Sequence, residues 1–160
     1  MAPWADWLYA CDFAWWDKYR GVPEFEGVKL SVDRKCQERP WGIQRVGINK
    51  NDDRLELLKF GTVGWAGNSG FHSLNLAVQL MPAKIVLVGF DMTVAHGVHW
   101  HGKHGLGLNN PTERNTIRWR RCVDAAAETI AALGIKVINT SAISALQNYE
   151  KMPLEKALEA

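Results

Sequence analysis

The sequence predicts an α/β protein built on a three-layer, mostly parallel Rossmann-like sheet. Three observations support this prediction. Apolar residues recur at helical spacing over 71–81, a continuous aliphatic run follows at 84–88, and a second helical pattern over 112–133 precedes another short strand. Helix, buried strand, helix and strand in alternation indicate crossover connections in a doubly wound sheet.

The first half of the chain is predicted to hold short strands around one short helix. Residues 28–32 alternate between apolar and polar side chains, as a half-buried strand does. A short strand over 5–11 and a short helix or helical turn over 13–19 come before it. A further strand over 43–48 runs into a polar turn over 49–53.

The second half has clearer boundaries. A small, polar turn over 66–70 opens the first long helix, and Pro82 stops it. The strand over 84–88 is aliphatic without interruption, which predicts burial on both faces of a parallel sheet. Thr112 or Asn110 is expected to cap the next helix.

That helix is expected to end at Gly134. A strand over 135–139 and a short helix over 153–160 complete the predicted elements. No internal repeat or low-complexity linker divides the chain, so residues 1–160 are expected to form a single domain.

Composition excludes several classes of function. The net charge of +2 gives no general attraction to nucleic acid, and no apolar run approaches the roughly 20 residues of a membrane-spanning helix. The N-terminus lacks the features of a signal peptide. The three cysteines are widely spaced, which suggests reduced thiols and a cytoplasmic location.

Tryptophan is unusually frequent near the N-terminus. Of the eight tryptophans, five fall in the first 41 residues: Trp4, Trp7, Trp15, Trp16 and Trp41. Few basic residues accompany them, so a base-stacking surface is not indicated. We expect them to pack on the sheet or to be buried between subunits of a homo-oligomer.

The turn Gly67-Asn68-Ser69-Gly70 is the first candidate site. Glycines let the backbone approach a ligand, and the unpaired N–H groups at a helix start attract phosphate. Asn68 and Ser69 are equally good capping residues, so helix capping without a ligand stays open as an alternative.

A second candidate is Gly89-Phe90-Asp91, at the carboxyl end of the predicted buried strand. Ligands of open α/β sheets bind outside the carboxyl ends of strands. A carboxylate there accepts from a ligand hydroxyl, ligates a metal or caps the next turn.

Four of the five histidines lie in one glycine-rich loop: His96, His99, His101 and His104. Imidazole serves both as a metal ligand and as an acid or base near neutral pH. A metal site, an acid–base or substrate loop, and a solvated or partner-facing loop all fit this pattern. His72, in the first helical turn, is expected to pack or cap.

Arg114, Arg118 and Arg121 are spaced to share one helix face. They would reach a phosphate from there, or else form a solvated face or salt bridges to Asp124 and Glu128.

Four motifs follow one another in an order that a known group shares. Asn-Ser-Gly at 68–70 opens a helix, Ile-Val-Leu-Val-Gly-Phe-Asp at 85–91 forms a strand, the histidine loop follows, and Val-Ile-Asn-Thr-Ser comes at 137–141. Together with residues 5–12, they resemble the Rossmann-like group of family 42 sialyltransferases and 6-hydroxymethylpterin diphosphokinase-like proteins. The chain resembles phage and prophage proteins of that pattern most.

The resemblance implies a nucleotide-sugar site. The nucleotide-binding positions would be Gly67, Asn68, Ser69 and Gly70 in the turn, with Gly89 and Asp91 at the strand end. A histidine after that strand acts as general base in the sialyltransferases, which makes His99, His101 and His104 the catalytic candidates.

Two departures from the group are visible. Its phosphate-binding tyrosine pair has no counterpart, because no tyrosine occurs between Tyr19 and Tyr149. The group also begins with a strand and a turn that hold the nucleotide, and this chain opens past that point. We therefore expect the sheet to lack its first strand and to leave a neighbouring strand unpaired.

The leading hypothesis is a phage-type Rossmann-like protein that binds a nucleotide or nucleotide-sugar, of transferase type if it is an enzyme. One alternative is a non-catalytic phage accessory or oligomerisation protein. The other is a metal-binding protein that uses the histidine loop.

Overall fold

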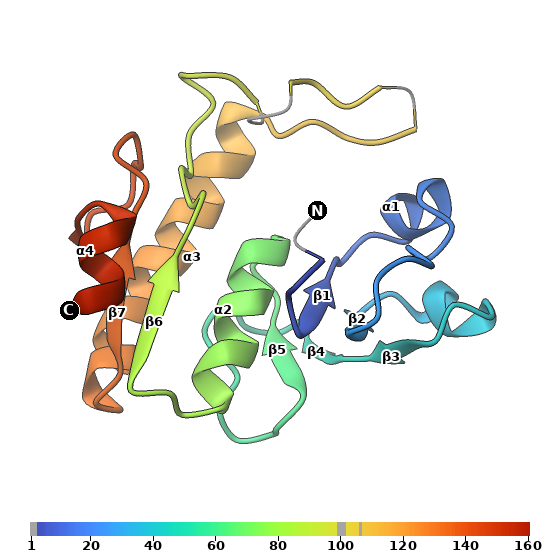
Figure 1. Ribbon diagram of the computed structural model, residues 1–160, viewed down its shortest axis with the longest axis horizontal. Helices are drawn as coiled ribbons and strands as arrows, with labels where there is room; N and C mark the ends of the chain where they lie inside the picture. The colour runs from blue at the N-terminus through green and yellow to red at the C-terminus, as the bar shows by residue number, and fades with distance from the viewer. Residues whose placement is uncertain (1–2, 99–101, 106) are drawn as a thin grey trace.

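The computed structural model describes residues 3–98, 102–105 and 107–160 of a mixed α/β chain (Figure 1). Every strand pair in it is parallel, and the strands are short. The strands are β1 (Trp7–Tyr9), β2 (Val28–Ser31), β3 (Ile43–Arg45), β4 (Gly47–Asn49), β5 (Thr62–Gly64), β6 (Lys84–Leu87), β7 (Lys136–Asn139) and β8 (Glu150–Lys151). The helices are α1 (Phe13–Lys18), α2 (Ser69–Gln79), α3 (Glu113–Ala132) and α4 (Leu154–Glu159), with a 3-10 helix η1 (Arg34–Glu38).

The strands form the groups β1-β2-β3, β4-β5 and β6-β7-β8. The first two groups share one extended segment, because only Val46 separates β3 from β4. The Val46 N–H donates to the carbonyl of Ser31 at the end of β2 at 2.9 Å, and the Gly47 N–H donates to the carbonyl of Gly61 beside β5 at 2.8 Å. Successive N–H groups of a strand point to opposite edges. The strands therefore follow the order β1-β2-β3/β4-β5.

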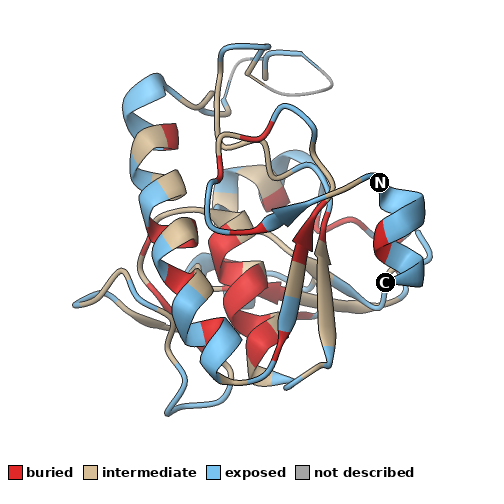
Figure 2. Cartoon of the chain, turned by 90° about the vertical axis from the view of Figure 1, so that its left-hand side faces the viewer, coloured by how far each residue is buried: buried red, intermediate tan, exposed pale blue. Residues whose placement is uncertain are grey.

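Helix α2 joins the two halves of the protein. Its residues Phe71, Leu74 and Val78 belong to a buried cluster that includes β6, β7 and α3. Leu76 of the same helix packs in a second cluster with residues of β2, β4 and β5. Figure 2 shows buried residues on the sides of helices and strands that face one another. The packing of α2 against both clusters thus fixes the position of the first turn of this helix.

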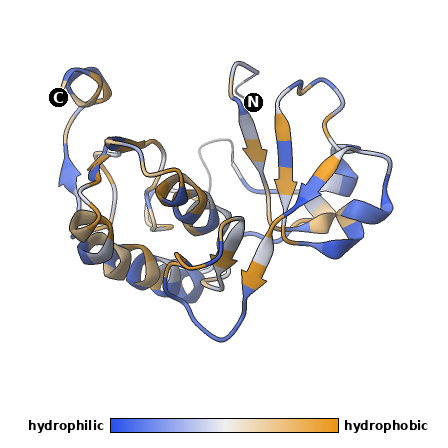
Figure 3. Cartoon of the chain, turned by 90° about the horizontal axis from the view of Figure 1, so that it is seen from below, coloured by the Kyte–Doolittle hydropathy of each residue, from blue (hydrophilic) through white to orange (hydrophobic). Residues whose placement is uncertain are grey.

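A third cluster lies beneath α1 and η1. It contains Trp16, which is fully buried, together with partly buried Trp15 and Trp41. Trp4 and Trp7 are exposed, at 84% and 41% of their surface. Packing within the protein is thus confirmed for Trp16, in part for Trp15 and Trp41, and not for Trp4 and Trp7. Burial between subunits, the other expectation, stays a prediction. Figure 3 shows the hydrophobic residues of the strands and the hydrophilic loops that join them.

The predicted elements agree closely with the structure. Thr112 caps α3 through a reciprocal pair of hydrogen bonds with Asn115, and Gly134 after its end has φ +75°. The sequence patterns did not indicate η1, β5 or β8, which are short. Mixed α/β architecture with parallel pairing is confirmed.

One prediction about the sheet is wrong. The strand over 84–88 was expected to be buried on both faces, but within β6 only Leu87 is buried and Val88 is 62% exposed. The reason is that β6 pairs with β7 alone among the described strands, so its other edge is open. No helix in the described part of the chain has the length and apolar character needed to cross a membrane.

Candidate functional site

A cavity of about 660 Å³ lies at the carboxyl end of β6. Three segments form its walls: the start of α2, the residues that follow β6, and the first turns of α3. Four of the predicted nucleotide-binding residues line it, namely Asn68, Gly70, Gly89 and Asp91. The structure therefore brings the turn and the strand end together at one site, as the order of motifs predicts.

The remaining two residues of the turn do not line this cavity. Gly67 has φ +68°, a conformation that suits glycine and lets the chain turn into α2. The Ser69 hydroxyl accepts from the backbone N–H of Cys11, just beyond β1, and donates to the Cys11 thiol, both at 3.1 Å. Ser69 thus holds α2 to the end of β1.

Asn68 both caps α2 and offers a donor to a ligand, so it fits both alternatives for the turn. Its Oδ1 accepts from the backbone N–H of Phe71 at 2.9 Å, which caps α2. Its amide Nδ2 has no hydrogen-bond acceptor among the described residues, and the side chain lines the cavity. The N–H groups of Ser69 and Gly70 also lack an acceptor within the described ranges. These donors are the anion-binding groups expected at a helix start.

Glycine is required at two positions in the cavity wall. A Cβ on Gly70 would lie 2.9 Å from Oδ1 of Asn68 and 3.3 Å from the Phe90 ring. Gly89 has φ +72°, which L side chains rarely adopt. Gly70 lets α2 approach the end of β6. Gly89 turns the chain so that Asp91 lines the cavity.

Asp91 is fixed by the loop that follows β7. Its carboxylate accepts a short hydrogen bond from the Ser141 hydroxyl. Its backbone carbonyl accepts from the N–H of Ala145 at 2.8 Å. Among the described residues, one of its two carboxylate oxygens accepts a hydrogen bond, and the other is available to a ligand hydroxyl.

The same loop is bonded to the end of β6 by further hydroxyl groups. Ser144 donates to the carbonyl of Phe90 at 2.6 Å and accepts from the buried Asn139 amide at 2.8 Å. Thr140 donates to the carbonyl of Leu87 at 2.9 Å. The Asn-Thr-Ser motif and the serine after it thus position the strand end instead of contacting the cavity.

The histidine loop contributes one described histidine to the cavity wall. His96 lines the cavity, although it was not selected from the sequence as a catalytic residue. His104 is not part of the lining; its backbone N–H donates to Oδ1 of Asn110 at 2.8 Å. His99 and His101 lie outside the described residues. The described residues include no group of three or more metal-ligating side chains.

Aromatic and apolar side chains form much of the remaining wall. Phe90 and Met92 follow β6, and Trp119 comes from α3. Trp119 stands among arginines and was not predicted to be a site residue. It lies three residues after Thr116, which places both on one face of α3, but the burial of Thr116 is seen only in the structure.

Behind the first turn of α2, buried groups have shifted pKa values. Burial, with smaller contributions from nearby groups, raises the pKa of the Cys11 thiol to about 11. Cys11 is therefore a neutral thiol near pH 7 and a poor nucleophile. Burial likewise lowers the pKa of His72, whose ring contacts Tyr9 and the turn. The expectation that His72 packs is confirmed.

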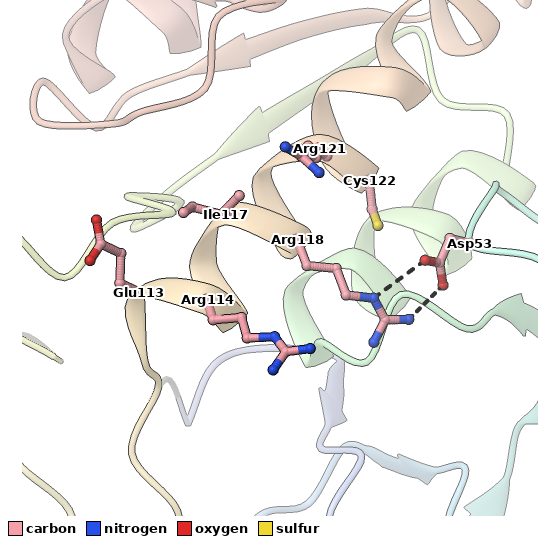
Figure 4. Close-up of a pocket in the computed structure, with 7 residues that line it drawn as sticks. All are labelled: Asp53, Glu113, Arg114, Ile117, Arg118, Arg121 and Cys122. Atoms are coloured by element: carbon pink, nitrogen blue, oxygen red, sulfur yellow. Dashed lines mark hydrogen bonds and ion pairs between the residues drawn. The ribbon is translucent and has the colours of Figure 1, made fainter.

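The arginine face of α3 lies at a separate, shallow hollow of about 600 Å³ (Figure 4). Arg118 forms a bidentate pair with Asp53, at 2.8 Å and 3.3 Å. Arg114, Arg118 and Arg121 are all exposed, which agrees with the predicted solvated face. Among the described residues they form no salt bridge to Asp124 or Glu128, which was the other alternative. The Asp124 carboxylate instead accepts from the backbone N–H groups of residues 147 and 148.

Comparisons of the chain with protein-family models, with curated proteins and with solved structures find no match.

Proposed function

We propose that the cavity between β6, α2 and α3 binds a nucleotide or nucleotide-sugar, as the ligand site of a Rossmann-like domain of transferase type. The observation that supports this most is the position of Asp91. Its carboxylate lines the same cavity as the first turn of α2, and the Ser141 hydroxyl holds it there.

The three walls offer the three kinds of contact that a nucleotide needs. The Gly70 N–H group and the Asn68 amide suit a phosphate. The Asp91 carboxylate suits the hydroxyls of a ribose. The indole of Trp119 is a flat, apolar surface on which a base stacks.

In a transfer reaction the acceptor hydroxyl would need a base. Among the described histidines, His96 is the one in the cavity wall, so we assign this role to it. His99 and His101 remain alternatives for the same role.

Thermal unfolding in the presence of CMP, UMP, AMP or GMP tests the proposal. A ligand at 100 times its Kd stabilises a protein by about 2.7 kcal/mol, which raises the Tm of a chain of this size by roughly 5–10 °C. We expect a saturable rise with at least one of the four.

Variants then locate the site. Asp91→Asn keeps an oxygen for Ser141 but removes the charge, and we expect it to weaken binding about tenfold. Asp6→Asn is the matched control, because Asp6 is exposed and its side chain has no hydrogen bond within the described residues. No Tm rise with any nucleotide, or an equal rise in Asp91→Asn and the native protein, would contradict the proposal.

A further inference from the structure

Among the strands that have one unpaired edge in the described residues, β1 and β6 both end beside the first turn of α2. Within the described residues, β1 pairs only with β2, and β6 pairs only with β7. Both pairs are parallel. An unpaired edge presents a row of backbone donors and acceptors that another strand can use.

The backbone bonds identify the unpaired groups of β1. The carbonyl of Asp6 accepts from the β2 side, and the N–H of Ala10 donates to that side. Because successive residues of a strand face opposite edges, the N–H and C=O groups of Trp7 and Tyr9 point to the open edge.

The same reasoning applies to β6. The carbonyls of Ala83 and Leu87 accept hydrogen bonds from the side of β7. The backbone groups of Lys84 and Val86 therefore point to the other, open edge.

The carboxyl ends of both strands meet the first turn of α2. The N–H of Cys11, just beyond β1, donates to Oγ of Ser69 at 3.1 Å. A Cβ on the neighbouring Gly70 would lie 3.3 Å from the ring of Phe90, just beyond β6. Figure 1 shows α2 between β6 and β1 in this view. One helical turn thus contacts both strand ends, although no described strand connects β1 to β6.

The side chains around the open edges are more exposed than their type predicts. Val88 is 62% exposed and Trp7 is 41% exposed. Ile85 and Val86 are only partly buried. Such an aliphatic run is typical of a strand with neighbours on both edges.

We propose that an extended, apolar peptide segment binds between β1 and β6 as an additional parallel strand. It would complete the strand order β8-β7-β6-peptide-β1-β2-β3/β4-β5. The backbone groups of Trp7, Tyr9, Lys84 and Val86 supply the hydrogen bonds, and aliphatic side chains suit a position between two sheet halves. This inference is independent of nucleotide binding.

Amide NMR spectra of the isotope-labelled protein test it with a defined probe. The probe is the capped peptide Lys-Val-Ile-Val-Val-Lys, and the control is the same peptide N-methylated at each aliphatic residue, which cannot form the ladder. We expect the amide signals of Tyr9 and Val86 to shift saturably with the probe and not with the control. No shift with the probe, or equal shifts with both peptides, would overturn the proposal.

Hydrogen exchange of the protein without peptide gives a second readout. The amides of Tyr9 and Val86 should exchange at least about tenfold faster than that of Leu87, which faces β7. If they are instead protected and the protein sediments as a dimer, a second copy occupies the edges and the peptide proposal is wrong. If they are protected in a monomer, the edges are not open and the proposal is equally wrong.

Discussion

The hydroxyl of Tyr9 lies 2.7 Å from Nδ1 of His72, and Nε2 of the same ring lies 2.7 Å from the backbone carbonyl of Trp65. A carbonyl oxygen only accepts, so Nε2 carries the proton and Nδ1 accepts from the tyrosine. His72 is 1% exposed and is therefore held as one neutral tautomer. Through this ring, β1 and the turn before α2 are bonded to the helix that forms the candidate site.

Acid should destabilise the protein through His72. Burial places its folded-state pKa below the ordinary 6.5, so the unfolded chain binds a proton at a higher pH than the folded one. The contribution of His72 to stability is therefore full above pH 6.5 and decreases as pH falls from there toward the folded-state pKa. The slope is at most about 1.4 kcal/mol per pH unit.

Urea unfolding at several pH values between 7.5 and 5 measures this slope, with His72→Gln as the comparison. Glutamine cannot titrate, and the other histidines are common to both proteins. Equal slopes in the two proteins would show that His72 does not titrate differently on unfolding.

Tyr9→Phe should reduce stability by about 1–3 kcal/mol, because it leaves the buried Nδ1 of His72 without its donor. The measurement is the free energy of unfolding in urea at pH 7.5. Tyr19→Phe is the control, since Tyr19 is 43% exposed and its hydroxyl has no hydrogen bond within the described residues. We expect the free energy of unfolding of Tyr19→Phe to stay within about 0.5 kcal/mol of that of the native protein. If Tyr19→Phe lost as much stability as Tyr9→Phe, the loss could not be assigned to the hydrogen bond between Tyr9 and His72.

Gly89→Ala should cost about 1–2 kcal/mol, because φ +72° forces the new Cβ into the left-handed region. Space is not the reason, since a Cβ there meets no atom within 4 Å. Gly105→Ala is the matched control: it is equally uncrowded, and its φ is not positive. Equal stability of the two variants in thermal unfolding would show that the turn after β6 adapts to a side chain.

The pair between Arg118 and Asp53 should contribute little to stability despite its bidentate geometry. Both side chains are nearly half exposed, at 46% and 43%, so water screens the interaction. A double-mutant cycle with Arg118→Met and Asp53→Asn should give a coupling energy below about 1 kcal/mol. A coupling of several kcal/mol would mean that the pair holds the loop before β5 onto α3.

The sequence predicted the long helices and the relation between turn and strand end because local signals specify them. Asn68 and Thr112 cap their helices as expected, and Asp91 follows a run of aliphatic residues. Crossover connections then bring the carboxyl ends of strands to one side. Gly70 and Gly89 meet at the cavity for this reason.

What the sequence did not predict depends on contacts between distant segments. One strand was expected to be left unpaired, but no local pattern identified β6 as having an open edge among the described strands or predicted the exposure of Val88. Ser69 was expected to face a ligand, but the end of β1 engages its hydroxyl. Trp119 and His96 enter the cavity through the packing of α3 and of the loop after β6, which residue types alone do not specify.

The most direct test of the central claim is the indole N–H signal of Trp119 during titration with the nucleotide that raises Tm most. We expect this signal and the amides of Gly70 and Gly89 to shift together with one Kd, while the indole signal of the fully buried Trp16 does not move. Shifts confined to Arg114, Arg118 and Arg121 on the arginine face, or no saturable shift at Gly70 and Gly89, would contradict nucleotide binding in this cavity.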